Sequence, residues 1–246
     1  MAKLNTNGNA YTIIYAAVIL VIVAFLLAFV ASALKPTQDD NVAIDKKQQI
    51  LSSLNIRGVE KSAVDATYKS VIVNDAIYGT DPTTPTNNGE AKDQAGFKVE
   101  GKNITPDNRP FYVAEVDGAK KYVIPVTGAG LWGGLWGYVA LNEDCETVYG
   151  TYFSHESETA GLGARITEQW FQDSFQGKKL YAEGNEDVVL SVVKKGKEGS
   201  MSPDNYVNGV TGATLTSKGV AAMVNDGLTA YKDFLLSVSD NQEVEQ

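Results

Sequence analysis

The hydrophobic pattern divides the chain into one long apolar segment near its start and a polar remainder with short apolar runs. No charged residue occurs between Lys3 and Lys35, and residues 11–34 are almost wholly apolar. At about 1.5 Å per helical residue these two dozen positions reach roughly 36 Å, more than the ~30 Å hydrocarbon core of a bilayer. We therefore expect a transmembrane helix at 11–34, preceded by a short tail at 1–10.

A removed signal peptide is the alternative for this segment, because Ala31-Ser32-Ala33 matches the A-x-A pattern of a cleavage site. The apolar region of a signal peptide is typically about 7–15 residues, and the segment is longer. Its length therefore favours a retained anchor. Lysines on both sides of the segment leave its orientation open.

Beyond the anchor, the apolar positions predict an α+β domain at 61–238 with a mostly antiparallel sheet packed by helices. Strand-like segments separated by turn residues predict strands at 71–77, 111–116, 122–126, 135–141, 147–153 and 188–193. Helical spacing predicts helices at 41–55, within a juxtamembrane segment 35–60, at 166–175, and from Ser217 to Leu235 at the end of the domain. The Asp117-Gly118 pair predicts a hairpin turn. Residues 81–94 should be an exposed loop and 239–246 an acidic, frayed tail.

Composition limits the chemistry. The 246 residues include 21 basic and 30 acidic side chains, a net charge of −9, with no basic groove interleaved with aromatics, so we expect no nucleic-acid binding. Cys145 is the only cysteine, which excludes an intrachain disulfide and a cysteine-ligated cluster, and we expect it to be a buried apolar residue. His155 is the only histidine, so a multi-histidine metal site is excluded as well, and we expect no metal.

The segment Gly128–Gly133 matches G-x-G-x-x-G, the dinucleotide-binding pattern, but its context argues against that site. The pattern must open a helix so that the pyrophosphate meets the helix N-terminus. Here a glycine- and aromatic-rich run follows, which predicts another strand. We expect a tight hairpin that lets a flat ring or another backbone approach, with Trp132 and Trp136 able to cover the ring. A plain glycine turn with core tryptophans is the alternative.

The most informative segment is Thr211-Gly212-Ala213-Thr214-Leu215-Thr216-Ser217, which places four hydroxyls and a glycine just before a predicted helix. The free N–H groups and positive dipole end of a helix N-terminus suit an anion such as a phosphate. Hydroxyls there can contact a phosphate, be esterified to one, or simply cap the helix.

This string resembles the flavinylation motif of the FMN-binding domain family, Ser/Thr-Gly-Ala-Thr-x-Thr. In that family the last threonine carries FMN through a phosphoester bond that a flavin transferase installs. The resemblance implies that Thr216 is the attachment site, within a cofactor-binding segment formed by Thr211, Gly212, Ala213, Thr214, Leu215 and Ser217. Asn208 occupies the position of the family's usual aspartate.

A second segment, His155–Arg165, resembles the His-x-Glu-Thr-Pro-Gly-Leu-Gly loop that lies beside the flavin ring in the same family. Ala160 replaces the proline, and His155 precedes the glutamate by three residues rather than two. The glycines would allow close backbone approach to a planar ligand. The matched residues, implied to contact the flavin, are Glu158, Thr159, Gly161, Leu162 and Gly163. A plain helix-entry loop is the alternative.

Taken in order, the anchor, the tryptophan-glycine segment and the two loops resemble the C-subunit family of the Na⁺-translocating NADH:quinone reductases. The resemblance implies an electron-relay subunit with covalent FMN, in a six-subunit complex of the bacterial inner membrane, with its soluble domain in the periplasm. Other subunits, membrane lipid and a flavin transferase would be its partners. The homologous G subunit of the Rnf complex, and a cofactor-free membrane-anchored periplasmic domain, are the alternatives.

Overall fold

The computed structural model describes residues 8–79, 96–185 and 187–243. The loop expected at 81–94 lies outside the described residues, as does the end of the acidic tail. The described chain forms two compact units, which divide between Asp45 and Lys46.

Helix α1 runs without interruption from Asn9 to Ser53 and includes Pro36. It carries an 18-residue window with a mean hydropathy of 3.2, none of it buried, and among the described residues it is the one helix long and apolar enough to cross a membrane. The separate helix expected at 41–55 is therefore the C-terminal part of α1. Its last turns, from Lys46, belong to the second unit and bury Ile50 and Leu51.

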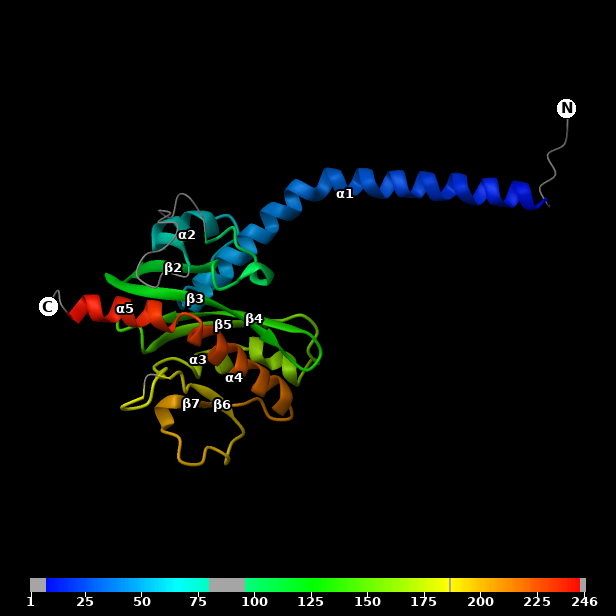
Figure 1. The fold of residues 1–246 in the computed structure, drawn as a ribbon. Helices are drawn as coiled ribbons and strands as arrows, with labels where there is room; N and C mark the ends of the chain where they lie inside the picture. Colours follow the sequence, from blue (N-terminus) through cyan, green and yellow to red (C-terminus); the bar gives the residue numbers. More distant parts are fainter. Residues whose placement is uncertain (1–7, 80–95, 186, 244–246) are drawn as a thin grey trace. The chain divides into compact units, whose positions relative to one another are not determined.

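The second unit is built on a five-stranded antiparallel sheet in the order β1-β2-β3-β4-β5 (Figure 1). The strands are β1 Ile72–Tyr78, β2 Arg109–Val116, β3 Ala119–Ala129, β4 Gly134–Leu141 and β5 Val148–His155. Each strand pairs with the next along the chain, which confirms the antiparallel α+β prediction. The β2–β3 turn places Asp117 at φ 53° and Gly118 at φ 76°, the positive angles that a tight hairpin of this twist requires.

Alternate residues of the sheet belong to two apolar layers. On β3, Ile124 and Val126 join a core with helix α4 Thr214–Thr229 and helix α5 Lys232–Glu243. The other face meets helix α2 Val64–Val71 and the last turns of α1 (Figure 1). Asp75 of β1 is fully buried and accepts a hydrogen bond from the Phe97 N–H at 2.9 Å.

Three predicted elements differ from the structure. The helix expected at 166–175 is a 3₁₀ turn, Gly163–Thr167, followed by the short helix α3 Gln169–Asp173. The helix expected from Ser217 to Leu235 begins earlier, at Thr214, and is two helices, so α5 rather than the motif helix ends the domain. Because α5 continues to Glu243, the tail expected at 239–246 starts as helix.

The strand expected at 188–193 is shorter and pairs in parallel. Strand β6 Ser191–Val193 lies beside β7 Tyr206–Asn208 in a separate two-stranded sheet. Short 3₁₀ turns at Gly101–Asn103 and Pro203–Asn205 complete the described elements. Strand β7 leads directly to the segment that begins α4, so the small sheet fixes the approach to the threonine-rich motif.

Candidate functional site

Thr216 lies in the first turn of α4 and is only 1% exposed. Its hydroxyl donates a hydrogen bond of 2.6 Å to Oε2 of Glu158, which is 58 residues away in the sequence. The two segments singled out by their sequence thus meet through these two side chains. A carboxylate accepting from a buried hydroxyl is a charge-assisted hydrogen bond, one of the stronger kinds in proteins.

Glu158 is held in place through its second oxygen. Oε1 accepts a hydrogen bond of 2.8 Å from the backbone N–H of Trp132, in the turn between β3 and β4. Burial by itself would raise the pKa of Glu158, but the hydrogen bonds from a hydroxyl and from backbone N–H groups outweigh burial and lower its pKa. Glu158 is therefore an ionised carboxylate at neutral pH.

Two glycines pack directly against this carboxylate. A Cβ at Gly163 would lie 2.4 Å from Glu158 Oε2 and 2.6 Å from Thr216 Oγ1, and a Cβ at Gly130 would lie 2.3 Å from Glu158 Oε1. Gly163 does not adopt a positive φ, so its position is dictated by space rather than by backbone angle. By contrast, Gly161 has a φ of 75° and open space around its would-be Cβ, so it serves the turn.

The residues before Glu158 fasten its loop to the β3–β4 turn. Ser157 donates a hydrogen bond of 2.7 Å to the Trp132 carbonyl, and Glu156 accepts one of 3.3 Å from the Gly134 N–H. His155 accepts the Glu158 N–H through Nδ1 at 3.2 Å. His155 therefore orients the loop backbone, a role that its sequence position did not reveal.

No threonine or serine of the motif caps helix α4. The N-cap residue is Ala213, which has no side chain able to accept a hydrogen bond from the helix. Ser217 instead accepts the Val210 N–H at 3.0 Å, while Thr211 and Thr214 are exposed. The simple helix-cap interpretation of the segment is therefore wrong, because its buried hydroxyls bond elsewhere.

Large apolar side chains are exposed on the segments that surround Thr216. Leu131 is 46% exposed, Trp132 66%, Leu162 43% and Leu215 57%. Leu162 lies against the backbone of the motif, since a Cβ at Gly212 would be 2.9 Å from Leu162 Cδ2. We call these four residues the apolar rim. The tryptophan of the β3–β4 turn is thus a surface residue and not part of the core.

A cavity of about 890 Å³ borders the same helix start and is lined by Thr211, Gly212, Thr214 and Ser217 of the motif. Its other lining residues include Lys194, Lys195, Lys197 and Lys218. Within the described part of the chain, none of these four lysines pairs with a carboxylate at 4.0 Å or less. In a chain with a net charge of −9, this is a local concentration of positive charge. We call it the lysine cavity.

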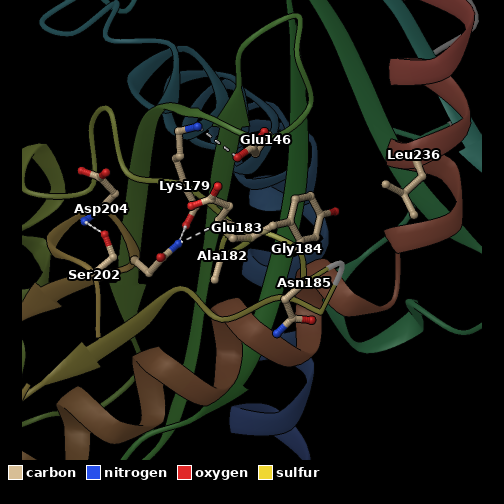
Figure 2. Close-up of a pocket in the computed structure, with 11 residues that line it drawn as sticks. Glu146, Lys179, Ala182, Glu183, Gly184, Asn185, Ser202, Asp204 and Leu236 are labelled. Carbon is tan, nitrogen blue, oxygen red and sulfur yellow. Dashed lines mark hydrogen bonds and ion pairs between the residues drawn. The ribbon is translucent and has the colours of Figure 1, made fainter. Parts of the chain in front are cut away.

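A second cavity, of about 740 Å³, lies between the segments near Lys179 and Ser202 and contains none of the residues singled out from the sequence (Figure 2). Lys179 pairs there with Glu146 at 3.3 Å, and the Asp204 N–H donates to Ser202 Oγ at 3.3 Å. None of its lining residues belongs to the threonine-rich motif, the Glu158 loop or the β3–β4 turn.

Of the residues predicted from the sequence, the structure brings together Trp132, Glu158, Gly163 and Thr216. Leu162 and Gly212, which were also predicted, are in contact with each other beside them. Thr159 is exposed and its carbonyl accepts the N–H of Leu162, so it shapes the loop. Sequence reasoning missed Gly130, although the glycine-rich turn was the signal for it. It also missed the four lysines, which come from segments separated along the chain.

The glycine-rich turn, the cysteine and the acidic side chains are the other features that bear on nucleotide, redox or metal chemistry. Residues 128–133 lead into strand β4 rather than a helix, so the dinucleotide-binding pattern is excluded there. Cys145 is buried, 2% exposed, and burial raises its pKa to about 12. Among the described residues no group of three or more His, Cys, Asp or Glu side chains is placed to hold a metal ion.

Comparison with known proteins places these features in a class. The FMN-binding domain family matches residues 130–229, which include the β3–β4 turn, the Glu158 loop and the whole motif segment. The C subunit of a Na(+)-translocating NADH-quinone reductase from Haemophilus ducreyi is 32% identical, with 89% of this chain and 90% of that protein aligned. The Pseudomonas aeruginosa C subunit is also 32% identical, over 92% and 96%.

Solved structures agree with the sequence relatives. The crystal structure of the C subunit from Parabacteroides distasonis has a TM-score of 0.73 and 38% identity, and the match covers 82% of this chain and 96% of that one. The Shewanella oneidensis NqrC structure, at 22% identity and a TM-score of 0.66, shares the fold. The chain carries an FMN-binding domain. It belongs to the C-subunit family of the Na⁺-translocating NADH-quinone reductases.

Proposed function

We propose that the chain is the electron-relay subunit of its complex and carries FMN covalently, through a phosphoester on Thr216, passing electrons toward quinone. The observation that carries the proposal is the state of the Thr216 hydroxyl. It lies in the first turn of a helix, caps nothing, and bonds to an ionised carboxylate. A relay flavin must not diffuse away, and a covalent link meets that need.

The apolar rim supports a flavin ring beside Thr216. An isoalloxazine is flat and largely apolar, and exposed leucine and tryptophan side chains are surfaces on which such a ring packs. The protein would then orient the ring and tune its redox potential through burial and local dipoles. In this arrangement Trp132 and Leu162 flank the ring, while Glu158 and Gly163 lie at the attachment point.

The lysine cavity supports a nucleotide with phosphates near the start of α4. Its hydroxyls and four lysines offer an anion both hydrogen bonds and positive charge. In the proposal, the cavity attracts the phosphates of the incoming flavin nucleotide. It thereby brings the nucleotide to the motif before the covalent bond forms.

The apolar part of α1 supports a retained anchor in the bacterial inner membrane. The soluble domain would face the periplasm, as the family resemblance implies, where a flavin transferase attaches the cofactor. The other subunits of a six-subunit complex would be its partners. The similarity to the C subunit over 89% of the chain favours this assignment over the G subunit of the Rnf complex.

The test is in-gel fluorescence of the full-length chain, co-expressed with a flavin transferase and denatured before electrophoresis. A fluorescent band that survives denaturation is the expected result. Thr216→Ala should abolish it, and the control Thr229→Ala, which removes an exposed hydroxyl at the other end of α4, should retain it. Peptide mass mapping that places FMN on any other hydroxyl would refute the assignment. A wild-type chain without flavin would favour the cofactor-free binding domain.

A further inference from the structure

We infer that Glu158 is a catalytic residue for attachment of the flavin: it is the general base that receives the proton of the Thr216 hydroxyl. The inference rests on the proposed attachment of FMN to Thr216. It adds a catalytic function to Glu158, for which the sequence suggested only a contact with the flavin ring. It also implies that the acceptor domain, and not the transferase alone, contributes to the reaction.

The geometry separates the two oxygens of Glu158 into two tasks. Oε1 is held by the Trp132 N–H, which fixes the carboxylate to the β3–β4 turn. Oε2 accepts the Thr216 hydroxyl at 2.6 Å, within the reach required of a general base. Because Thr216 donates its proton to Glu158, the lone pairs of its oxygen are free to attack an electrophile.

The residues around Glu158 and Thr216 hold these two side chains in position. Gly130 and Gly163 lie against the two carboxylate oxygens, so closely that a Cβ at either position would collide with them. The hydrogen bonds that lower the pKa of Glu158 keep it ionised and therefore able to accept a proton. A carboxylate that only contacted the flavin ring would not need hydrogen bonds to both of its oxygens.

The chemistry requires an activated flavin donor. Attack of a hydroxyl on FMN itself would expel hydroxide, a poor leaving group, so the donor must be a phosphoanhydride of FMN, such as flavin adenine dinucleotide. In the step, the bond between Thr216 Oγ1 and the flavin-side phosphorus forms and the anhydride P–O bond breaks. The adenosine monophosphate leaves, and the hydroxyl proton moves to Glu158 Oε2.

Access to Thr216 constrains how the step takes place. The side chain is 1% exposed, so something must move before a phosphorus atom can approach it. Glu158 is tied to Trp132 and to His155, whereas Gly163 follows the exposed Leu162. Displacement of the Leu162–Gly163 side of the loop would uncover the hydroxyl and leave its bond to Glu158 intact.

The test measures initial rates of covalent flavin incorporation into the purified full-length chain with purified flavin transferase and excess flavin adenine dinucleotide. Glu158→Gln is the main variant, because its amide can still accept the Trp132 N–H and can donate to Thr216, which conserves the packing while removing the base. Glu156→Gln is the matched control, since it neutralises a carboxylate of the same loop that contacts Gly134 and not Thr216.

We expect Glu158→Gln to lower the initial rate about 100-fold, the usual contribution of a general base. Glu156→Gln should react as wild type. The ratio of the wild-type rate to the Glu158→Gln rate should also shrink as the pH falls and the wild-type carboxyl becomes protonated. A Glu158→Gln rate within about threefold of wild type would overturn the inference, as would a pH-independent ratio.

The controls separate the inference from the function on which it rests. If the wild-type chain acquires no flavin at all, the proposed attachment fails. If it does and Glu158→Gln keeps pace, only the general base fails. Melting temperatures establish that the variants fold. If Glu158→Gln does not fold, Glu158→Asp is the variant to measure. Its carboxylate is withdrawn by one methylene, so attachment should slow at least about tenfold. A wild-type rate for Glu158→Asp would refute the inference.

Discussion

Replacing Gly163 by alanine is the most direct perturbation of the site, because one methyl group would fall on the hydrogen bond between Thr216 and Glu158. The added Cβ would lie 2.4 Å from the carboxylate and 2.6 Å from the hydroxyl. Contacts this short cannot persist, so one partner must move. The carboxylate is already held from its other side by Trp132 and Gly130. We therefore expect the hydrogen bond to break.

The magnitude follows from what is lost. A hydrogen bond to a charged group contributes about 1.5–3 kcal/mol, and the free energy of unfolding should fall by about 2–3 kcal/mol. For a domain of this size that corresponds to a decrease in melting temperature of roughly 5–10 °C. The rate of flavin attachment should fall as well, since the acceptor hydroxyl loses its partner.

Gly161→Ala is the matched control in the same loop. Its Cβ would meet nothing within 4 Å, but its φ of 75° is unfavourable for alanine by roughly 1–2 kcal/mol. The lower entropy of the unfolded alanine chain offsets about 0.4–1 kcal/mol of this cost. Gly161→Ala should thus cost about 1 kcal/mol and should not slow flavin attachment. Thermal unfolding and attachment kinetics on both variants are the assays. Equal attachment rates in the two variants would refute the reasoning.

Other parts of the chain lead to three further predictions. Burial raises the pKa of Asp75 to about 6, so its contribution to stability is present below its unfolded pKa of 3.8 and is lost as the pH rises through 6. Between acid and neutral pH, the free energy of unfolding of Asp75→Asn should therefore rise relative to that of the wild type by up to about 3 kcal/mol. Urea titrations that show a pH-independent difference between the two proteins would contradict this. Trp132→Ala should change the free energy of unfolding by less than about 0.5 kcal/mol, because the indole side chain is 66% exposed. It should nevertheless shift the absorption or midpoint potential of the bound flavin. An unchanged flavin would show that Trp132 does not contact the isoalloxazine. The segment 11–34 should remain on the mature protein and resist alkaline extraction from membranes, and a mature N-terminus at Leu34 would identify a signal peptide instead.

The sheet could be predicted from the sequence because its information is local. Each strand is a run of 7–11 residues rich in apolar side chains, and Asp117-Gly118 marks a turn with its own backbone requirement. The sequence pattern predicted α4 and α5 as one helix, because it too reports only local spacing. Leu228, Tyr231 and Leu235 keep helical spacing across the break after Thr229, so periodicity alone does not reveal it.

The site could be predicted only in part, since its central contact is not local. Both loops could be recognised by their glycines and hydroxyls, but nothing in the sequence states that Glu158 bonds to Thr216. That pairing depends on the β3–β4 turn, which positions the carboxylate through the Trp132 N–H. The glycine of this turn that limits where the carboxylate can lie, Gly130, gains its meaning only from the three-dimensional arrangement.

The burial of Thr216 has a kinetic consequence. A hydroxyl that is 1% exposed reacts only in the fraction of molecules whose loop is open, so the observed rate is the intrinsic rate multiplied by that fraction. Substitutions that loosen the Leu162–Gly163 side without touching Glu158 would therefore speed attachment, even as they lower stability. Maturation of the proposed flavoprotein would then be governed by a local unfolding equilibrium, measurable by amide hydrogen exchange at Gly163.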